Sequence, residues 1–313
     1  MVTAITTPDE LVCFVADRGD ARRRLDQAIL RHLYDVSPLS RTRVQGWIDG
    51  GRVTVDAQVA RRASTRTAEG ARIEILLPPD VRRRQPPAAE LVPIEVLFRD
   101  DALLAVNKPP GIVVHPTYKQ TAGTLLNAIL AHVPERTSEP GIITRLDKHT
   151  SGLVLVALAP DVHRLVQEAA DNGHVRKEYL ALVCGTPSPS QGEIRDALGR
   201  DATDRRRVTA TDGGVSATTR YDVVASSGDR SLVRCELVTG RTHQIRAHLA
   251  GRGWPLVGDV TYGSRDVRLG DRQALHAWRL TLPHPFTRET LTVTAPIPAD
   301  LRDAAPELWQ PFS

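Results

Sequence analysis

A short polar segment, TRLDKHTSG at residues 144–152, interrupts two apolar runs that are typical of buried strands, GII before it and LVLVAL after it. A turn between strands needs about two to five residues and favours Gly, Asn or Pro near its centre. This segment instead carries Arg145, Asp147 and Lys148. A carboxylate flanked by cations is suited to nucleophilic attack or proton removal. A lone Asp in a turn is more often structural, so a solvated loop is the alternative.

Further polar segments interrupt the predicted strands and carry side chains that could bind a substrate. NKPPGIVVHP at 107–116 is a loop stiffened by proline, and RKEYLALV contains Tyr179. TGRTHQIRAHLA contains Arg241, His243 and Arg246, and the last two share one face of a predicted helix because they are three residues apart. The first amides and the arginines of such a helix could hold a phosphate. The ordinary alternative is that a Tyr in a strand is core and an Arg on a helix is solvated.

The first part of the chain predicts a compact module. Apolar residues recur at helical spacing from Leu25 to Leu33, and Ser40 is a good N-cap for a second helix. RVTVDAQVA alternates apolar and polar residues as a hairpin does, and ARIEILLPP predicts a closing strand. The proline-rich segment DVRRRQPPAAELVP indicates a linker. We therefore expect an N-terminal extension at 1–20, the module at 21–79, the linker at 80–93 and a larger domain at 94–313.

The module also holds the basic excess of the chain. Residues 21–84 contain fourteen arginines and seven acidic residues, whereas residues 85–313 contain equal numbers of the two signs. A concentrated excess of this kind is typical of a polyanion contact, most often nucleic acid, although a merely solvated face is the alternative. The arginines that we expect on the outer surface for RNA contact are Arg22, Arg23, Arg24, Arg41 and Arg43.

The larger domain contains more predicted strands than helices, and their order is not a regular βαβ alternation. We therefore expect an α+β fold with a mixed, mostly antiparallel sheet rather than a doubly wound one. Helices are expected in GTLLNAILAHV, VHRLVQEAADNG and RTHQIRAHLAG. The other apolar runs, including GIITRLD, are expected to form strands.

Composition argues against several classes of protein. No apolar run reaches the ~18 residues of a membrane span, and the N-terminus lacks the features of a signal peptide. Three widely separated cysteines make neither a disulfide framework nor a zinc site. The sequence has no phosphate-loop, dinucleotide-binding or metal-ligand spacing. We expect a soluble, cytoplasmic monomer with no cofactor, no metal and no membrane partner.

Two resemblances sharpen these expectations. The pattern RLDQAIL, LSRTRVQGWIDGGRVTVD and GARIEI, within residues 21–78, resembles the S-four-like RNA-binding domain named after a small-subunit ribosomal protein, except that VTVDAQ replaces the usual Asn-Gly turn. Six later segments resemble, in order, the RluA family of RNA pseudouridine synthases, in its RluC/RluD-like branch. They are NKPPGIVVHP, RLDKHTSGLVLVA, KEYLALVCG, TGRTHQIRAHL, PLVGDVTYG and LHAWRLTLPHP. The family motif H-R-L-D-x-x-T-S/T-G is matched except that Thr144 replaces the usual His, and His149 stands where the branch often has Asp.

The second resemblance implies an isomerase that needs no cofactor. The N-glycosidic bond of a uridine is broken, the bound base turns, and the base is rejoined through carbon. Asp147 would carry the reaction, either as nucleophile at the anomeric carbon or as base at the neighbouring ribose carbon. Arg246 would pair with this carboxylate and favour its charged form, and Tyr179 would stack on the extruded uracil and assist proton removal from carbon. Substrate or RNA contacts are expected from Arg145, Arg241 and His243.

The resemblance implies structured RNA as substrate, most often large-subunit ribosomal RNA or pre-ribosomal particles. One alternative is a non-catalytic RNA-binding or ribosome-assembly factor on the same scaffold, which we would expect to lack Asp147, Tyr179 or Arg246. Another alternative is a nucleosidase or glycosidase for small substrates. Most glycosidases use two carboxylates, whereas we expect a single one at this site.

Overall fold

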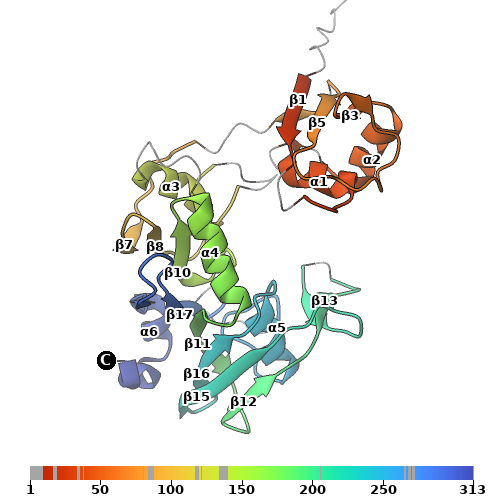
Figure 1. Ribbon diagram of the computed structural model, residues 1–313. Helices are drawn as coiled ribbons and strands as arrows, with labels where there is room; N and C mark the ends of the chain where they lie inside the picture. Colours follow the sequence, from red (N-terminus) through yellow and green to blue (C-terminus); the bar gives the residue numbers. More distant parts are fainter. Residues whose placement is uncertain are drawn as a thin grey trace, which may run out of the picture. The chain divides into compact units, whose positions relative to one another are not determined.

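The chain divides into two compact units, residues 1–86 and 87–313 (Figure 1). The boundary falls inside the segment that was predicted as a linker. The computed structural model describes residues 10–16, 20–33, 36–37, 39–79, 81–83, 88–116, 120, 122–133, 140–204, 206–263, 266, 269 and 272–312. Parts of the predicted extension and linker, including residues 1–9, 17–19 and 84–87, lie outside this description.

The smaller unit packs two helices against a four-stranded sheet of order β1-β5-β3-β4. Its elements are β1 (Glu10–Val15), α1 (Leu25–His32), β2 (Val36–Ser37), α2 (Arg41–Asp49), β3 (Val53–Val55), β4 (Gln58–Val59), β5 (Arg72–Leu77) and β6 (Arg82–Arg83). Ser40 caps α2 as predicted, since its hydroxyl accepts a hydrogen bond from the backbone N–H of Arg43. The predicted hairpin is present as β3 and β4, joined by a turn in which Asp56 and Ala57 both have positive φ.

One expectation about this unit is corrected. Residues 10–15 were assigned to an extension outside the module, but β1 pairs with β5 along its whole length, from Glu10 opposite Leu77 to Val15 opposite Arg72. Val12 of β1 is buried in the core of the unit. The segment ELVCFV is therefore a strand of the sheet, which its short apolar run did not reveal without its partner.

The larger unit is built on a ten-stranded sheet of order β12-β15-β16-β11-β17-β10-β8-β7, with β18 paired to β17 and β9 paired to β10. The strands are β7 (Glu95–Arg99), β8 (Leu103–Lys108), β9 (Gly141–Ile142), β10 (Ser151–Ala157), β11 (Arg176–Cys184), β12 (Gln191–Ile194), β15 (Thr219–Ser227), β16 (Arg230–Leu237), β17 (Leu275–Pro283) and β18 (Thr290–Thr294). Of these strand pairs, β10 with β17 is parallel and the others are antiparallel. The expected mixed, mostly antiparallel α+β fold is confirmed.

Helices and a two-stranded ribbon surround this sheet (Figure 1). They are α3 (Leu125–His132), α4 (Pro160–Asp171), the ribbon β13 (Leu198–Arg200) and β14 (Val208–Ala210), α5 (Gln244–Gly251), α6 (Ala299–Ala304) and the 3₁₀ helix η1 (Pro306–Phe312). The three predicted helices are present as α3, α4 and α5. The strand predicted in GIITRLD is reduced to the two residues of β9, because the polar half of that segment is loop.

Side chains alternate between the two faces of β11 and so divide the core. Tyr179 and Ala181 face a cluster that includes Ile245 and Leu249 of α5. Leu180 and its neighbour Leu182 belong to a second cluster, which α6 and η1 complete. Helix α5 is thus held on one face of the sheet by its apolar stripe, and its polar side chains are left to line a site.

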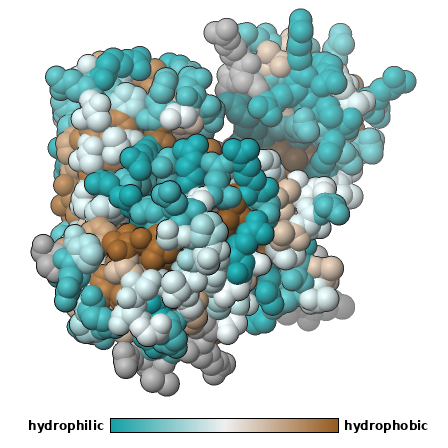
Figure 2. Space-filling view, turned by 90° about the horizontal axis from the view of Figure 1, so that it is seen from below, coloured by the Kyte–Doolittle hydropathy of each residue, from teal (hydrophilic) through white to brown (hydrophobic). Residues whose placement is uncertain are grey.

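The surface view in Figure 2 is mostly hydrophilic, with smaller apolar areas among the polar residues. Scattered apolar exposure of this kind is ordinary for folded proteins. Among the described residues, none of the helices has the length and apolar character that crossing a membrane requires.

Candidate active site

Asp147 lies on the loop that leads into β10, and backbone contacts fix this loop. The Thr150 N–H donates to the carbonyl of Asp147, and the Gly111 N–H donates to the carbonyl of Lys148. The side chain of Thr144 is buried, and its hydroxyl accepts a hydrogen bond from the Leu155 N–H at 2.8 Å. The residue that departs from the family motif at this position therefore anchors the loop to β10.

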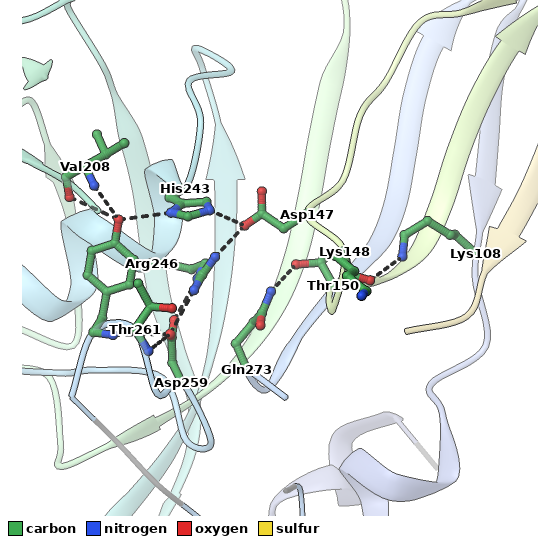
Figure 3. Close-up of polar contacts among 11 residues, drawn as sticks. Lys108, Asp147, Lys148, Thr150, Val208, His243, Arg246, Asp259, Thr261 and Gln273 are labelled. Carbon is green, nitrogen blue, oxygen red and sulfur yellow. Dashed lines mark hydrogen bonds and ion pairs between the residues drawn. The ribbon is translucent and has the colours of Figure 1, made fainter. Parts of the chain in front are cut away.

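A buried lysine ties the proline-rich loop to the aspartate loop. Lys108 Nζ donates to the carbonyls of Pro109 and Ile112 at 2.9 and 3.0 Å. It also donates to the carbonyl of Lys148 at 3.0 Å (Figure 3). Burial, together with the charge of Arg272, lowers the pKa of Lys108 to about 7. Lys108 therefore positions both loops, a role that the NKPP segment did not reveal in the sequence.

Arg246 of α5 joins two carboxylates (Figure 3). Its Nη1 donates to Asp147 Oδ2 at 2.9 Å, while its Nε and Nη2 donate to the two oxygens of Asp259 at 2.7 and 2.9 Å. Burial alone lowers the pKa of this guanidinium, but the hydrogen bonds and charges of Asp259 and Asp147 outweigh burial and raise it. Arg246 is therefore a permanent cation beside Asp147, as the resemblance implied.

Asp259 was missed by the sequence analysis, which expected a single carboxylate. Its side chain is 1% exposed and also accepts hydrogen bonds from the backbone N–H groups of Thr261 and Tyr262. The side chain of Asp147 is 25% exposed. The expectation of one carboxylate is wrong, but the two differ in kind: Asp259 is enclosed and fully engaged, whereas Asp147 reaches the pocket. The segment PLVGDVTYG contained Asp259, but nothing in the spacing distinguished it from a turn residue.

His243 also faces Asp147, although from a different position than predicted. It is the N-cap of α5, with φ of 55° in the left-handed region, and not a residue of the helix itself. Its Nε2 lies 3.8 Å from Asp147 Oδ2, and its Nδ1 lies 3.2 Å from the Tyr262 hydroxyl. Burial lowers the pKa of His243, against the opposing effect of the Asp147 charge. The imidazole is therefore neutral at neutral pH.

Tyr179 projects from β11 into the same pocket and is 8% exposed. Burial, reinforced by the charge of Asp147, raises the pKa of its phenol. Tyr179 therefore stays protonated. A protonated phenol is better suited to stacking on a uracil ring than to accepting a proton.

All six side chains predicted for the site line one pocket. Arg145 and Arg241 are exposed there, and Arg241 Nε donates to the carbonyl of Ser216 at 3.1 Å. The remaining lining is largely apolar, as an extruded base requires. The pocket is lined by Arg145, Leu146, Asp147, Thr150, Tyr179, Leu237, Arg241, His243, Gln244, Ile245, Arg246 and Leu275.

The arginines predicted for RNA contact lie in the smaller unit and are not equivalent. Arg22, Arg23 and Arg41 are exposed, and Arg24 and Arg43 are partly buried. Buried Asp26 accepts hydrogen bonds from Arg24 at 3.0 and 3.2 Å and from Arg41 Nε at 2.9 Å. Burial raises the pKa of Asp26, but these arginines and Gln45 reverse that effect and lower it. Asp26 thus neutralises and orients part of the predicted basic surface.

Comparison with known proteins identifies the family. The family model described as RNA pseudouridylate synthase matches residues 102–251. Ribosomal large subunit pseudouridine synthase D of Nitrosomonas europaea is 38% identical over 95% of this chain and 85% of that protein. An uncharacterized RNA pseudouridine synthase of Bacillus subtilis is 38% identical over 84% of this chain and 88% of that protein. This chain belongs to the RluA family of RNA pseudouridine synthases.

Solved structures of RNA pseudouridylate synthases share the fold over much of this chain. Human RNA pseudouridylate synthase domain containing 4 has a TM-score of 0.56 and 25% identity, over 68% of this chain and 92% of that one. Human RNA pseudouridylate synthase domain containing 1 has a TM-score of 0.54 and 28% identity, over 72% of this chain and 89% of that one. The activity of this RluA-family chain is therefore isomerisation of uridine to pseudouridine in RNA. In the part of the chain that the structure describes, no group of three or more His, Cys, Asp or Glu side chains could hold a metal ion.

Proposed function

We propose that this chain isomerises uridines of large-subunit ribosomal RNA, with Asp147 as the reacting group. Support for the substrate comes from relatives such as the Nitrosomonas europaea protein, whose name specifies the large ribosomal subunit. Support for the reacting group comes from one observation above the others. Asp147 is the pocket-lining carboxylate, and it is held 2.9 Å from a buried guanidinium.

The geometry is compatible with both routes that a carboxylate can take. An ionised Asp147 can attack the anomeric carbon or remove the proton of the neighbouring ribose carbon. Arg246 donates a hydrogen bond to one oxygen, Oδ2, and so fixes its position. Extruding a uridine from structured RNA costs a few kcal/mol, and stacking on Tyr179 offsets about 1–3 kcal/mol of that cost.

We infer that the smaller unit is an S-four-like RNA-binding domain that supplies phosphate contacts. Its sequence pattern and its concentration of arginines support this reading. Arg145 and Arg241 are proposed to contact phosphates next to the extruded uridine, because both are exposed and line the pocket.

We further propose that the enzyme acts in the cytoplasm, as a monomer, on ribosomal RNA or pre-ribosomal particles. Size-exclusion chromatography with light scattering would test the oligomeric state directly.

The decisive experiment maps pseudouridines in all RNAs of cells with and without this gene. Sites in large-subunit ribosomal RNA should revert to uridine in its absence. The wild-type gene and the control Asp303→Asn, an exposed carboxylate on α6, should restore them, whereas Asp147→Asn should not. Restoration by Asp147→Asn would remove this residue from its role. Sites confined to another RNA would contradict the proposed substrate alone.

A further inference from the structure

His243 is held in an unusual backbone conformation that aims its ring at the site. Its φ of 55° lies in the left-handed region, which costs a residue other than Gly, Asn or Asp about 1 kcal/mol or more. The residue stands at the N-terminus of α5, directly before Gln244, whose amide is buried and bonded to Thr218 and Thr219. The surroundings therefore fix the backbone, and the ring points toward Asp147 (Figure 3).

The hydroxyl of Tyr262 couples the tautomer of His243 to Val208. That hydroxyl accepts the Val208 N–H at 2.9 Å and lies 3.1 Å from the Val208 carbonyl, to which it can donate. A hydroxyl has one proton and two lone pairs. When the proton is on the Val208 carbonyl, the hydroxyl meets His243 Nδ1, 3.2 Å away, as an acceptor. In this tautomer Nδ1 carries the hydrogen of the neutral ring, and Nε2 is left with a lone pair.

The free lone pair faces the reacting carboxylate. His243 Nε2 lies 3.8 Å from Asp147 Oδ2, too far for a hydrogen bond, and both atoms are acceptors in this tautomer. The ring is also partly open to the pocket, since 20% of its side chain is exposed. A neutral nitrogen base thus stands beside the catalytic carboxylate, with no proton of its own to donate to it.

The groups around the ring keep it neutral without making it inert. The titratable and charged groups that face it are Asp147 on the loop before β10, Arg246 on α5, and Asp259 and Tyr262 on the loop that follows α5. Burial lowers the pKa of His243 below its ordinary 6.5, Arg246 acts in the same direction, and the two carboxylates oppose them. A proton that arrived at Nε2 would be stabilised by Asp147, so the base can accept one transiently.

We propose that His243 Nε2 is the base that removes the proton from C5 of the rejoined uracil, a role that rests on the proposed function. When the turned base has formed its bond from C5 to the ribose, C5 still carries its hydrogen and N1 carries none. The C5–H bond breaks, its electron pair returns to the ring, and the proton passes to Nε2. The imidazolium then gives a proton to N1, so atoms and electrons balance and the enzyme is restored. The protonated phenol of Tyr179 cannot take this role without losing its own proton first.

Two variants separate a base from a structural residue. His243→Asn keeps a residue type that tolerates the left-handed region but removes the base. Tyr262→Phe keeps the ring packing but removes the hydroxyl that accepts from Nδ1 in this tautomer. Exposed His174→Asn is the matched control. Single-turnover rates are measured on a substrate RNA with hydrogen or deuterium at C5 of the target uridine, together with RNA affinity and melting temperature.

We expect His243→Asn to slow product formation by about 10²-fold or more with RNA affinity within a few-fold of wild type. A deuterium isotope effect at C5 should appear, because cleavage of that bond becomes the slow step. Tyr262→Phe should slow the reaction by about five-fold, the equivalent of one hydrogen bond. The wild-type rate should fall at a pH below 6.5, the ordinary pKa of a histidine, because the pKa of His243 is lowered from that value. This fall should be absent from His243→Asn.

A wild-type rate for His243→Asn, or a slow reaction without a C5 isotope effect, overturns this inference while leaving the proposed function intact. A wild-type protein that forms no pseudouridine in any RNA overturns the proposed function and this inference with it.

Discussion

At the residue scale, the centre of the site is a guanidinium shared by two carboxylates. Asp259 accepts hydrogen bonds from two nitrogens of Arg246, and Asp147 accepts one from the third. Because Asp259 is enclosed and is also bonded to two backbone amides, it behaves as a fixed support. Arg246 is thereby oriented before any substrate arrives. A preorganised cation stabilises a transition state more than one that must be ordered during the reaction.

The first prediction concerns this support. Asp259→Asn should reduce the single-turnover rate by about 10²-fold, since small displacements of reacting groups carry penalties of this size. RNA affinity should change little, because Asp259 is buried and cannot touch the substrate. Asp196→Asn is the control, as it removes a partly exposed carboxylate that pairs with Arg252 just beyond the same helix. Equal rates for the two variants would show that Asp259 does not orient Arg246.

The second prediction concerns Tyr179. Tyr179→Phe should keep the stacking surface, and Tyr179→Ala should lose about 1–3 kcal/mol of binding per stacked base. Binding of both variants to an RNA that carries 5-fluorouridine at the target position provides the measurement. Thermal melting should accompany it, since the ring also packs in the core beside α5. Equal affinity of Phe and Ala variants would argue against stacking.

Sequence reasoning located these residues unevenly, for a physical reason. Asp147, Tyr179 and Arg246 stood in polar segments between apolar runs, where a charged or aromatic residue is conspicuous. Asp259 occupied a glycine-containing turn, where an aspartate is common. Its importance comes from a partner thirteen positions away, and a pairing of that kind becomes visible only once the chain has folded.

At the element scale, the catalytic loop depends on one close strand contact. Gly152 is the second of the two β10 residues that pair with β17, and its φ is +110°. A Cβ atom there would overlap the backbone of Ala277, whose nitrogen would be 2.7 Å away. The glycine is therefore required for β10 to pair with β17, and this pairing fixes the end of the loop that carries Asp147.

Gly152→Ala should accordingly destabilise the larger unit by about 2–4 kcal/mol, the range for strained backbone positions combined with overpacking. The free energy of unfolding in denaturant would measure the loss. Gly251→Ala at the end of α5 is the control, because a Cβ there meets no atom within 4 Å and the backbone is helical. A similar effect from both substitutions would show that the close strand contact is not limiting.

Helices and strands with regularly spaced apolar residues were predictable from the sequence. Elements that depend on tertiary packing were not. Helices α1 to α5 and the long strands followed from apolar spacing. The ribbon β13 and β14 was not predicted, since each strand has three residues and no alternation. Helix α6 and η1 were also not predicted. Their apolar residues have no clear helical spacing in the sequence, and their role is seen only where they pack on β11 and β16.

At the scale of the whole molecule, the two units differ in charge. Each has its own buried core, and the arginine excess is concentrated in the smaller one. Asp26 already neutralises part of that excess by binding Arg24 and Arg41. Among the predicted contacts, Arg22 and Arg23 are adjacent and both exposed, so they can be tested together for an electrostatic role.

Phosphate contacts release counterions, so each arginine that neutralises a phosphate adds about one to the slope of log affinity against log salt concentration. The double variant Arg22→Ser, Arg23→Ser should reduce this slope by about two and leave the rate on saturating RNA unchanged, because neither residue lines the pocket. Arg164→Ser combined with Arg302→Ser, two exposed arginines on α4 and α6, removes the same charge from the larger unit. If both double variants shift the slope equally, net charge alone governs affinity. A shift confined to the first places the phosphate contacts on the smaller unit.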